Sequence, residues 1–335
     1  MKNALSILGT GVYLPPSLPV RDIVQKAGQD PSGHQGWDNC CHALEDDHPS
    51  NMGVTALRKA LDDAGVDPAE LKLVLFAGMS RDYLPSWSVA TEIMKACGTQ
   101  AHCFGLDMTI GCLGALSALD MAQGWLATHG GGVAAIVAAE RWTYTIDYTS
   151  IENLGLWGHS DGAAATIVSL DTAHKSKASF CGAEFVAQPD LNGTVLVEYG
   201  GTQNPIAPPG VKPFGRKLMG LSRNDLRQRY SDGYSDSLKA LKTRFDCNPQ
   251  RVVINQTANL FLRLIASVIE IPIENFILTG HETGHVGSAC GTERPGRAGD
   301  RFGRISDRER PRCHERQRRS AQIQLRYSGI LSRRQ

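Results

Sequence analysis

Cys112 lies at the junction between two segments of different periodicity. Residues 103–110 predict a short buried strand, and the apolar residues between 113 and 122 recur at helical spacing. A thiol at such a junction meets unpaired backbone N–H groups and the positive end of the helix dipole, and both favour the thiolate. The small residues Gly111 and Gly114 leave room for an acyl group beside the sulfur. We therefore predict a cysteine nucleophile at this position, with a small buried hydrophobic residue as the alternative.

The elements that would position Cys112 alternate between strands and helices. Apolar runs predict strands at residues 5–13, 71–77, 103–110, 133–139, 163–170, 178–186, 194–199, 252–254 and 274–278. Helical periodicity predicts helices at residues 52–64, 86–97, 113–128 and 224–245, and one more around 261–268. This alternation is typical of an α/β fold with parallel pairing between the strands that flank each helix. Residues 14–50 show little periodicity and are expected to be irregular.

Composition limits the class of protein further. The 335 residues include nine cysteines, an odd number, scattered without the paired spacing of a metal site. The longest apolar runs are too short to cross a bilayer, and the N-terminus reads as a core strand rather than a cleavable signal. We expect a reduced, cytoplasmic enzyme with no metal and no membrane partner.

Charge is distributed unevenly along the chain. Residues 291–335 hold thirteen arginines, no lysine and five acidic residues, so this segment carries +8 while the remaining residues carry −7. High charge with few apolar residues predicts disorder. A basic arm for nucleic acid is the functional alternative, but interleaved aromatic residues are lacking, so nucleic acid is not the expected partner. The abrupt change after Cys290 is typical of a shifted reading frame or a degenerate terminus.

Several motifs of residues 3–289 carry a resemblance to a known family. They are Met52–Gly65, Leu71–Ala77, Pro85-Ser86, Asp107-Met-Thr-Ile-Gly-Cys-Leu-Gly114, Ala138-Ala-Glu140 and Gly158-His-Ser-Asp-Gly-Ala-Ala-Ala165. Their order resembles the thiolase superfamily, and within it the β-ketoacyl synthase III (FabH-like) group. The Cys112 and Asp161-Gly162 segments are the most specific of them.

The resemblance implies an αβαβα sandwich of two similar halves that forms a homodimer. Residues 1–172 would be the half that carries the nucleophile, residues 173–290 the second half, and residues 291–335 a disordered tail. The family closes its second half with a helix, two strands and a Gly-rich segment that supplies an oxyanion-hole N–H. None of these is recognisable after residue 290, so we expect an incomplete second half and question the activity of the chain.

The resemblance also implies a catalytic set in which two residues have exchanged places. The family uses a His in a His-Gln-x-Asn motif and an Asn in a Gly-Asn-x-Ser segment. Here Asn255 stands at the His position, and no His is present in the neighbouring register either, while His285 stands at the Asn position. We predict Cys112 as nucleophile, His285 as general base and Asn255 as ligand of a thioester oxygen. Related acyltransferases place an Asp where this chain has Cys290.

This set favours acyl transfer over condensation. We expect an acyltransferase that moves an acyl group from acyl-CoA or an acyl carrier protein to a carrier-protein or natural-product acceptor. Polyketide or antibiotic biosynthesis is the expected setting, with no permanently bound cofactor. The alternatives are a synthase III that condenses an acyl starter with malonyl carrier protein, and an inactive partner subunit of a related synthase.

Some neighbouring residues have two interpretations. His281 and Glu282 could orient His285 or form a polar loop. His159 is interpreted as a structural residue of its loop. Trp37 falls where relatives contact the CoA adenine, but the surrounding pattern is absent, so no CoA contact is assigned to it.

Overall fold

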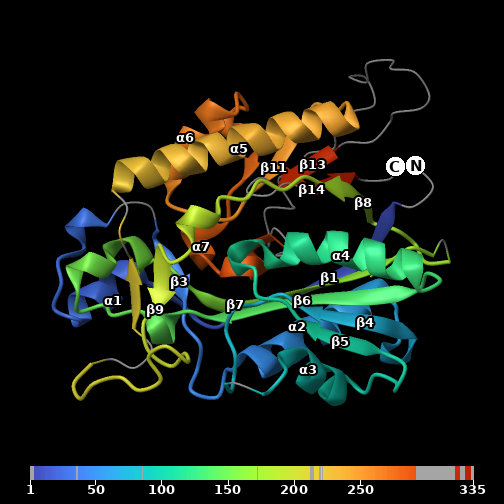
Figure 1. Ribbon diagram of the computed structural model, residues 1–335, viewed down its shortest axis with the longest axis horizontal. Helices are drawn as coiled ribbons and strands as arrows, with labels where there is room; N and C mark the ends of the chain where they lie inside the picture. Colours follow the sequence, from blue (N-terminus) through green and yellow to red (C-terminus); the bar gives the residue numbers. More distant parts are fainter. Residues whose placement is uncertain are drawn as a thin grey trace.

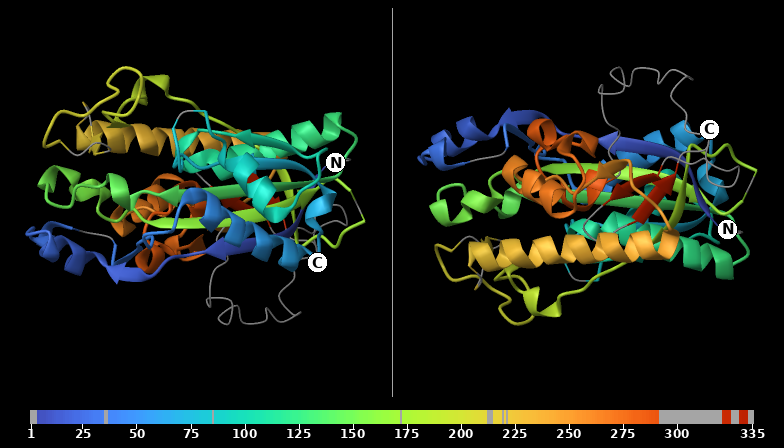
Figure 2. Two further views of the ribbon diagram at one scale, coloured as in Figure 1. Left: turned by 90° about the horizontal axis from the view of Figure 1, so that it is seen from below. Right: turned by 90° about the horizontal axis from the view of Figure 1, so that it is seen from above.

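The computed structural model describes residues 4–34, 37–84, 86–171, 173–211, 215–218, 220, 222–291, 321–324 and 329–332. Figure 1 shows five layers in which helices and sheet alternate. The outer helices are α2 (Pro49–Ala64) and α3 (Val89–Cys97) on one side and α5 (Arg223–Phe245) and α6 (Asn259–Val268) on the other. Helix α4 (Gly114–Thr128) lies in the middle layer. Figure 2 shows the outer faces from below and from above. The predicted αβαβα architecture is confirmed.

Ten strands form one mixed sheet in the order β12-β11-β13-β14-β8-β1-β7-β6-β4-β5. The first half contributes β1 (Leu5–Tyr13), β4 (Leu71–Phe76), β5 (Phe104–Asp107), β6 (Val133–Arg141) and β7 (Asp161–Ser169). The second contributes β8 (Ala178–Ala183), β11 (Arg251–Val253), β12 (Phe276–Ile277), β13 (Ala321–Gln324) and β14 (Gly329–Ser332).

The two halves repeat one topology. In each half the spatial order is third, second, fourth, fifth and first strand, and the first strands β1 and β8 join the halves by antiparallel pairing. The second strand pairs in parallel with the third and fourth in both halves, and the remaining pairs are antiparallel. The expected similarity of the halves therefore extends to the direction of every strand.

Pairing direction differs from the sequence-based expectation. The predicted parallel pairing is correct for β4 with β5 and β6, but β1, β6 and β7 pair antiparallel. A run of buried apolar residues indicates a strand and carries no information about the direction of its neighbour. Residues 14–50 are not wholly irregular either, since they contain β2 (Ser17–Pro19), α1 (Val20–Lys26) and β3 (Asn39–Cys41). Elements of three to seven residues are too short to produce a periodic signal.

The prediction that no strand follows residue 290 is wrong. Strands β13 and β14 lie between β11 and β8 and give the second half its full set of five strands. Each is only four residues long, so the arginine-rich composition around it hides the pattern. The remaining calls on residues 292–320, including disorder and the loss of a helix and a Gly-rich segment, lie outside the described residues. The proposed boundaries at 172 and 290 stay predictions.

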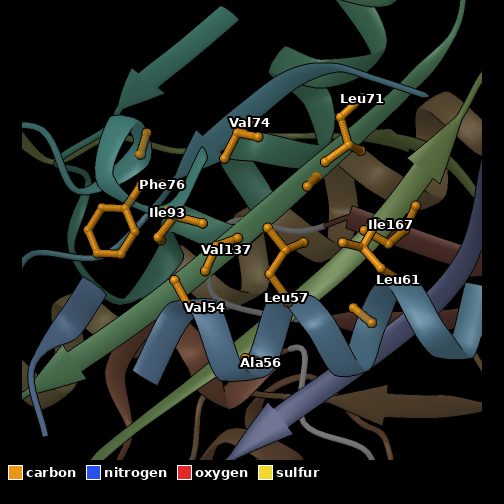
Figure 3. Close-up of a cluster of buried hydrophobic side chains, with 14 of the residues drawn as sticks. Val54, Ala56, Leu57, Leu61, Leu71, Val74, Phe76, Ile93, Val137 and Ile167 are labelled. Atoms are coloured by element: carbon orange, nitrogen blue, oxygen red, sulfur yellow. The ribbon is translucent and has the colours of Figure 1, made fainter. Parts of the chain in front are cut away.

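The core of the first half forms where α2 lies on the sheet. Leu57 and Leu61 of α2 pack against Val137 and Ile167 of the central strands (Figure 3). Each such fully buried side chain contributes about 1.5–3 kcal/mol. Gly11 of β1 allows the helix to approach the strand closely, because a Cβ there would lie 2.1 Å from the Ala56 carbonyl oxygen. Among the described residues, none of the helices is long and apolar enough to span a membrane.

Candidate active site

Cys112 lies in the 3-10 turn η3 (Gly111–Leu113), which runs directly into α4. Gly111 opens this turn with φ of 75°, a left-handed conformation that glycine adopts without strain. Gly114 lets the helix start close to the end of β4, because a Cβ there would lie 2.0 Å from the Ala77 carbonyl oxygen. The predicted position of the thiol between a strand and a helix is therefore present, but the predicted buried strand at 103–110 is wrong in extent and burial. Strand β5 ends at Asp107 and is half exposed because it lies at the edge of the sheet, and a short 3-10 turn precedes the helix.

The imidazole of His285 faces the thiol. Its Nε2 lies 3.2 Å from the Cys112 Sγ, and its Nδ1 lies 2.6 Å from the backbone carbonyl oxygen of Gln256. A carbonyl oxygen only accepts hydrogen bonds, so this contact assigns the proton of the neutral ring to Nδ1. The Nε2 lone pair is then directed at the sulfur, and His285 is 4% exposed. The geometry is that of a cysteine–histidine dyad with its tautomer fixed by a backbone group.

Asn255 completes the predicted trio. Its Nδ2 donates to the backbone carbonyl oxygen of Cys112 at 2.9 Å, across 143 residues of sequence. Its Oδ1 is buried and has no hydrogen-bond partner in the described part of the chain. The structure thus brings Cys112, His285 and Asn255 together. The predicted contact between Asn255 and a thioester oxygen stays a prediction, and so do the roles assigned to the other two residues.

The backbone of His285 is held by the segment from Gly158 to Ser160. His285 N–H donates to the Gly158 carbonyl at 2.8 Å, and Ser160 N–H donates to the His285 carbonyl at 2.9 Å, which makes a parallel bridge between His159 and His285. The Ser160 hydroxyl in turn accepts from the Cys41 N–H at 2.6 Å. Gly158 and Ser160 therefore hold the backbone of His285 in place.

Aromatic rings surround this imidazole, and sequence reasoning did not find them. The His159 ring meets the His285 ring edge-on with centroids 4.8 Å apart, and the Trp37 ring lies 6.3 Å from it. Trp37 packs directly on Gly158, where a Cβ would come within 2.2 Å of the Trp37 Cγ. A glycine opposite a tryptophan far away in sequence has no local pattern that could reveal the contact.

Cys290 is a second thiol beside the same ring. Its Sγ lies 3.9 Å from His285 Nδ1 and accepts a hydrogen bond from the Val286 N–H at 3.0 Å. It is 3% exposed. Cys290 therefore lies nearest the Nδ1 side of the ring, whereas Cys112 faces Nε2.

Glu140 of β6 forms hydrogen bonds with two segments of the site. Its buried carboxylate accepts hydrogen bonds from Met79 N–H and Ser80 N–H, both at 3.0 Å, and from the Ser288 hydroxyl at 2.9 Å. Burial raises the pKa of Glu140, and these hydrogen bonds oppose that shift. The loop after β4 and the turn η8 (Gly287–Gly291) are thereby tied to one side chain of β6.

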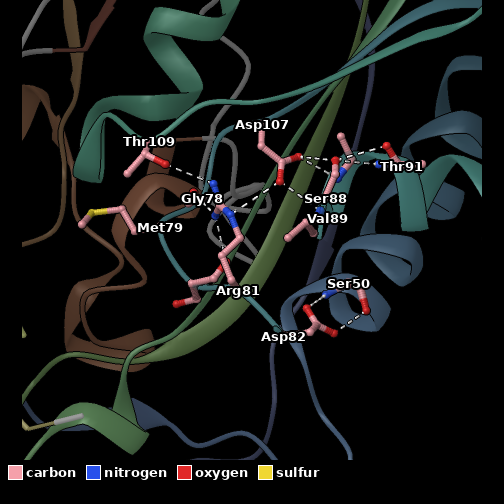
Figure 4. A network of polar contacts seen from close by, with 12 residues as sticks. Ser50, Gly78, Met79, Arg81, Asp82, Ser88, Val89, Thr91, Asp107 and Thr109 are labelled. Carbon is pink, nitrogen blue, oxygen red and sulfur yellow. Dashed lines mark hydrogen bonds and ion pairs between the residues drawn. The ribbon is translucent and has the colours of Figure 1, made fainter. Parts of the chain in front are cut away.

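A polar network secures the segment that leads into Cys112 (Figure 4). Asp107, at the end of β5, accepts from the Val89 and Ala90 N–H groups at 2.9 and 2.8 Å and so caps α3. The Arg81 Nε lies 3.5 Å from this carboxylate, and the Arg81 guanidinium donates to the Thr109 hydroxyl at 3.1 Å. Thr109, three residues before Cys112, is thus connected through Arg81 to Asp107 at the end of the sheet.

His281 and Glu282 form a pair with each other at the surface. Their side chains are 3.6 Å apart and largely exposed, whereas the Nδ1 of His285 is oriented by Gln256. Asp161 also has a structural position, since it accepts hydrogen bonds from Ala43 N–H and Thr143 N–H. No group of three metal-ligating side chains occurs in the described ranges.

Comparisons with known proteins show similarity to one family of enzymes. A family model described as 3-oxoacyl-[acyl-carrier-protein (ACP)] synthase III matches residues 106–189, which include Cys112 and the Gly158–Ala165 motif. A beta-ketoacyl-[acyl-carrier-protein] synthase III from Sulfurovum sp. is 23% identical over 257 residues, which are 74% of this chain and 72% of the relative. Other relatives of that name align over 51% of their own length.

Solved structures support the same fold. The 3-oxoacyl-[acyl-carrier-protein] synthase III of Aquifex aeolicus superposes with a TM-score of 0.78 at 18% identity, covering 98% of this chain and 100% of that one. OleA from Xanthomonas campestris, solved as a variant with bound lauric acid and lauroyl-CoA, superposes with a TM-score of 0.78 at 17% identity over 100% of both chains. At these identities the likeness concerns the fold alone. The family-model match over residues 106–189, the relatives and the fold make this chain similar to 3-oxoacyl-[acyl-carrier-protein] synthase III enzymes, and they support an acyl-thioester-handling enzyme of the transferase class.

Proposed function

We propose that this protein transfers an acyl group through a thioester on Cys112 to a thiol, hydroxyl or amine acceptor. The donor would be acyl-CoA or an acyl carrier protein. The observation that carries the proposal is the orientation of His285, whose Nδ1 is 2.6 Å from the Gln256 carbonyl oxygen and whose Nε2 is 3.2 Å from the Cys112 Sγ. An imidazole fixed in this way accepts protons at Nε2.

In the first half-reaction His285 takes the proton of the Cys112 thiol, and the thiolate attacks the carbonyl carbon of the donor thioester. The C–S bond to the donor breaks from the tetrahedral intermediate, and the leaving thiolate receives the proton from the imidazolium. The start of α4 lies beside the sulfur, so its N–H groups favour the negative charge that develops there.

In the second half-reaction the same Nε2 removes the proton of the acceptor. The acceptor attacks the Cys112 thioester, a new acyl bond forms, and the C–S bond to Cys112 breaks. The thiolate regains its proton from the imidazolium, which returns the dyad to its starting state. One base therefore serves both steps, and no cofactor takes part in either.

Decarboxylative condensation fits these contacts less well. It needs hydrogen-bond donors at the thioester oxygen of a malonyl group, to stabilise the enolate that forms on loss of CO₂. With its proton on Nδ1, His285 presents an acceptor rather than a donor towards the thiol. Asn255 uses one of its two Nδ2 hydrogens on the Cys112 carbonyl and keeps one for a thioester oxygen. One donor in place of the family's two supports simple transfer.

The proposed pathway, protein partner and oligomeric state have separate grounds. A polyketide or other natural-product pathway and a carrier-protein partner follow from the resemblance alone. A homodimer is supported by the edge strand β5, on which Phe104 and Leu106 are 51% and 45% exposed. A second copy that pairs with this edge would cover both side chains.

The proposal is tested by separating transfer from condensation. The protein is loaded with ¹⁴C-acyl-CoA and then given thiol, hydroxyl and amine acceptors, or malonyl-CoA with and without carrier protein. We expect label on an acceptor and no CO₂ release from the malonyl thioester. Release of CO₂ that depends on Cys112 would show a condensing enzyme instead. A folded chain that takes no label from any donor would favour the inactive-subunit alternative.

A further inference from the structure

The side chain of Gln256 uses its entire hydrogen-bonding capacity inside the protein. Its Nε2 donates to the Ile254 carbonyl at 2.8 Å and to the Ile277 carbonyl at 3.1 Å. Its Oε1 accepts from the N–H groups of Thr279 and Gly280, both at 2.9 Å. A primary amide offers two donors and two lone pairs, so all four are used, and the residue is 2% exposed.

These four bonds connect the ends of two strands and the start of a helix. The ladder between β11 and β12 pairs Val252 with Phe276 and Val253 with Ile277, and goes no further. Beyond it, the Gln256 amide bridges the two diverging chains and holds the first residue of α7 (Gly280–Thr283). The packing is close as well, because a Cβ at Gly280 would lie 2.8 Å from the Gln256 Cβ.

The same residue contacts the proposed base through its backbone. The Gln256 carbonyl oxygen lies 2.6 Å from His285 Nδ1, and His285 follows α7 after one glycine. The side chain of Gln256 therefore fixes both the acceptor that orients the ring and the helix from which the ring's backbone emerges. The acceptor of the ring proton and the helix that precedes His285 are thus tied together by one side chain.

We propose that Gln256 is a positioning residue, whose side-chain clamp sets the tautomer and the direction of the His285 imidazole towards Cys112. This inference rests on the proposed role of His285 as the base. Loss of the clamp would let the carbonyl move and the proton occupy Nε2 in part of the molecules. Misplacement of a reacting group by about 1 Å costs on the order of 100-fold in rate, so we expect Cys112 reactivity to fall about 10- to 100-fold.

The experiment measures iodoacetamide alkylation of Cys112 by peptide mass spectrometry between pH 5 and 9, which needs no acyl donor. Gln256→Met keeps the side-chain volume and removes all four hydrogen bonds. Gln188→Met is the matched control, because Gln188 is half-buried and donates one inter-element bond, to the Arg229 carbonyl at 3.0 Å, away from the site. We expect the control to retain the parent pH profile.

A double variant distinguishes positioning from general structural damage. If Gln256 acts through His285, the variant with both Gln256→Met and His285→Ala alkylates at the rate of His285→Ala alone. Losses that multiply would overturn the proposal, and so would a Gln256→Met protein with the parent rate and pH profile. An unchanged rate in His285→Ala would also overturn it.

A spectroscopic measurement covers the case in which Gln256→Met does not fold. In ¹⁵N-histidine-labelled parent protein, assigned with His285→Ala, we expect the His285 ring to carry its proton on Nδ1. A proton on Nε2 would contradict the proposal without any substitution at Gln256. If no acyl donor labels the protein but alkylation depends on His285 and Gln256 as expected, the proposed function fails while this inference stands.

Discussion

Two thiols of this protein have very different surroundings. Cys112 is partly exposed beside an imidazole, whereas Cys40 is fully buried next to Cys41 and near the Asp161 carboxylate. Burial, with those neighbours, raises the pKa of Cys40 from an ordinary value of 9.0 to about 12. The raised pKa favours the uncharged thiol, which does not react with electrophiles.

We predict that alkylation discriminates between these two residues. At pH 8 a thiol with a pKa of about 12 is ionised in roughly one molecule in ten thousand. Limited treatment with iodoacetamide followed by peptide mapping should therefore modify Cys112 and leave Cys40 intact until the protein unfolds. Early modification of Cys40 in the folded protein would contradict its burial and its raised pKa.

At the residue scale the sequence predicts which side chains form the site better than it predicts which groups hold those side chains in place. Cys112, His285 and Asn255 could be named in advance because a nucleophile motif and two exchanged positions mark them. The Gln256 carbonyl could not, because every residue has a carbonyl and its role depends on the path of the backbone. The resemblance marks Cys290 only as the position of an Asp in relatives, whereas its 3.9 Å distance from His285 Nδ1 depends on the path of the turn η8.

At the scale of elements, the absence of a side chain at Gly158 allows the segment 158–160 to pack against Trp37 and His285. Gly158 lies under the Trp37 ring and accepts the His285 N–H through its carbonyl. We predict that Gly158→Ala displaces the ring or the segment, lowers stability by about 1–3 kcal/mol through overpacking, and slows Cys112 acylation. Chemical denaturation and acylation kinetics measure both effects.

Gly124→Ala is the matched control for that substitution. Gly124 lies on the exposed side of α4, and a Cβ there meets nothing within 4 Å. Alanine should stabilise the helix by about 0.5–1 kcal/mol with no change in acylation. Equal behaviour of the two variants would mean that the contact between Trp37 and Gly158 has no bearing on the site.

Long elements with a strong period were predictable, and short or direction-dependent features were not. The bounds predicted for the helices at 113–128 and 224–245 agree with α4 and α5 within one residue. The antiparallel pairing of β7 with β1 and β6 was missed, because burial on both faces removes the alternation that would distinguish such a strand. Strands β13 and β14, four residues each, lie in the arginine-rich segment and were not recognised, whereas β11 and β12 fall at the predicted strands 252–254 and 274–278.

At the scale of the whole molecule, β13 and β14 connect the outer strands of the second half to the rest of the sheet. Without them β8 and β11 would each have an unpaired edge. We predict that a chain ending at Gly291 melts at a lower temperature and aggregates, since open edges are templates for further pairing. A chain that lacks only residues 333–335 is the control. Equal melting temperatures of the two truncated chains would contradict this placement.

The other edge of the sheet offers a second test. If β5 pairs with a second copy, light scattering coupled to size exclusion should give twice the mass of one chain. Leu106→Glu, which places a charge at the proposed centre of that contact, should yield the monomer. Phe185→Glu, at another exposed apolar residue, should leave the mass unchanged. A parent protein that elutes as a monomer would contradict the dimer.

The proposed mechanism depends on one covalent step, the transfer of an acyl group to the Cys112 sulfur. The most direct measurement is intact mass after mixing the protein with a panel of acyl-CoAs, for the parent, Cys112→Ala and His285→Ala. The account predicts an adduct of the acyl mass on the parent and none on Cys112→Ala. It also predicts adduct formation slowed by a factor on the order of 100 or more in His285→Ala, the usual contribution of a positioned base. An adduct that persists in Cys112→Ala, or forms at the parent rate in His285→Ala, would contradict it.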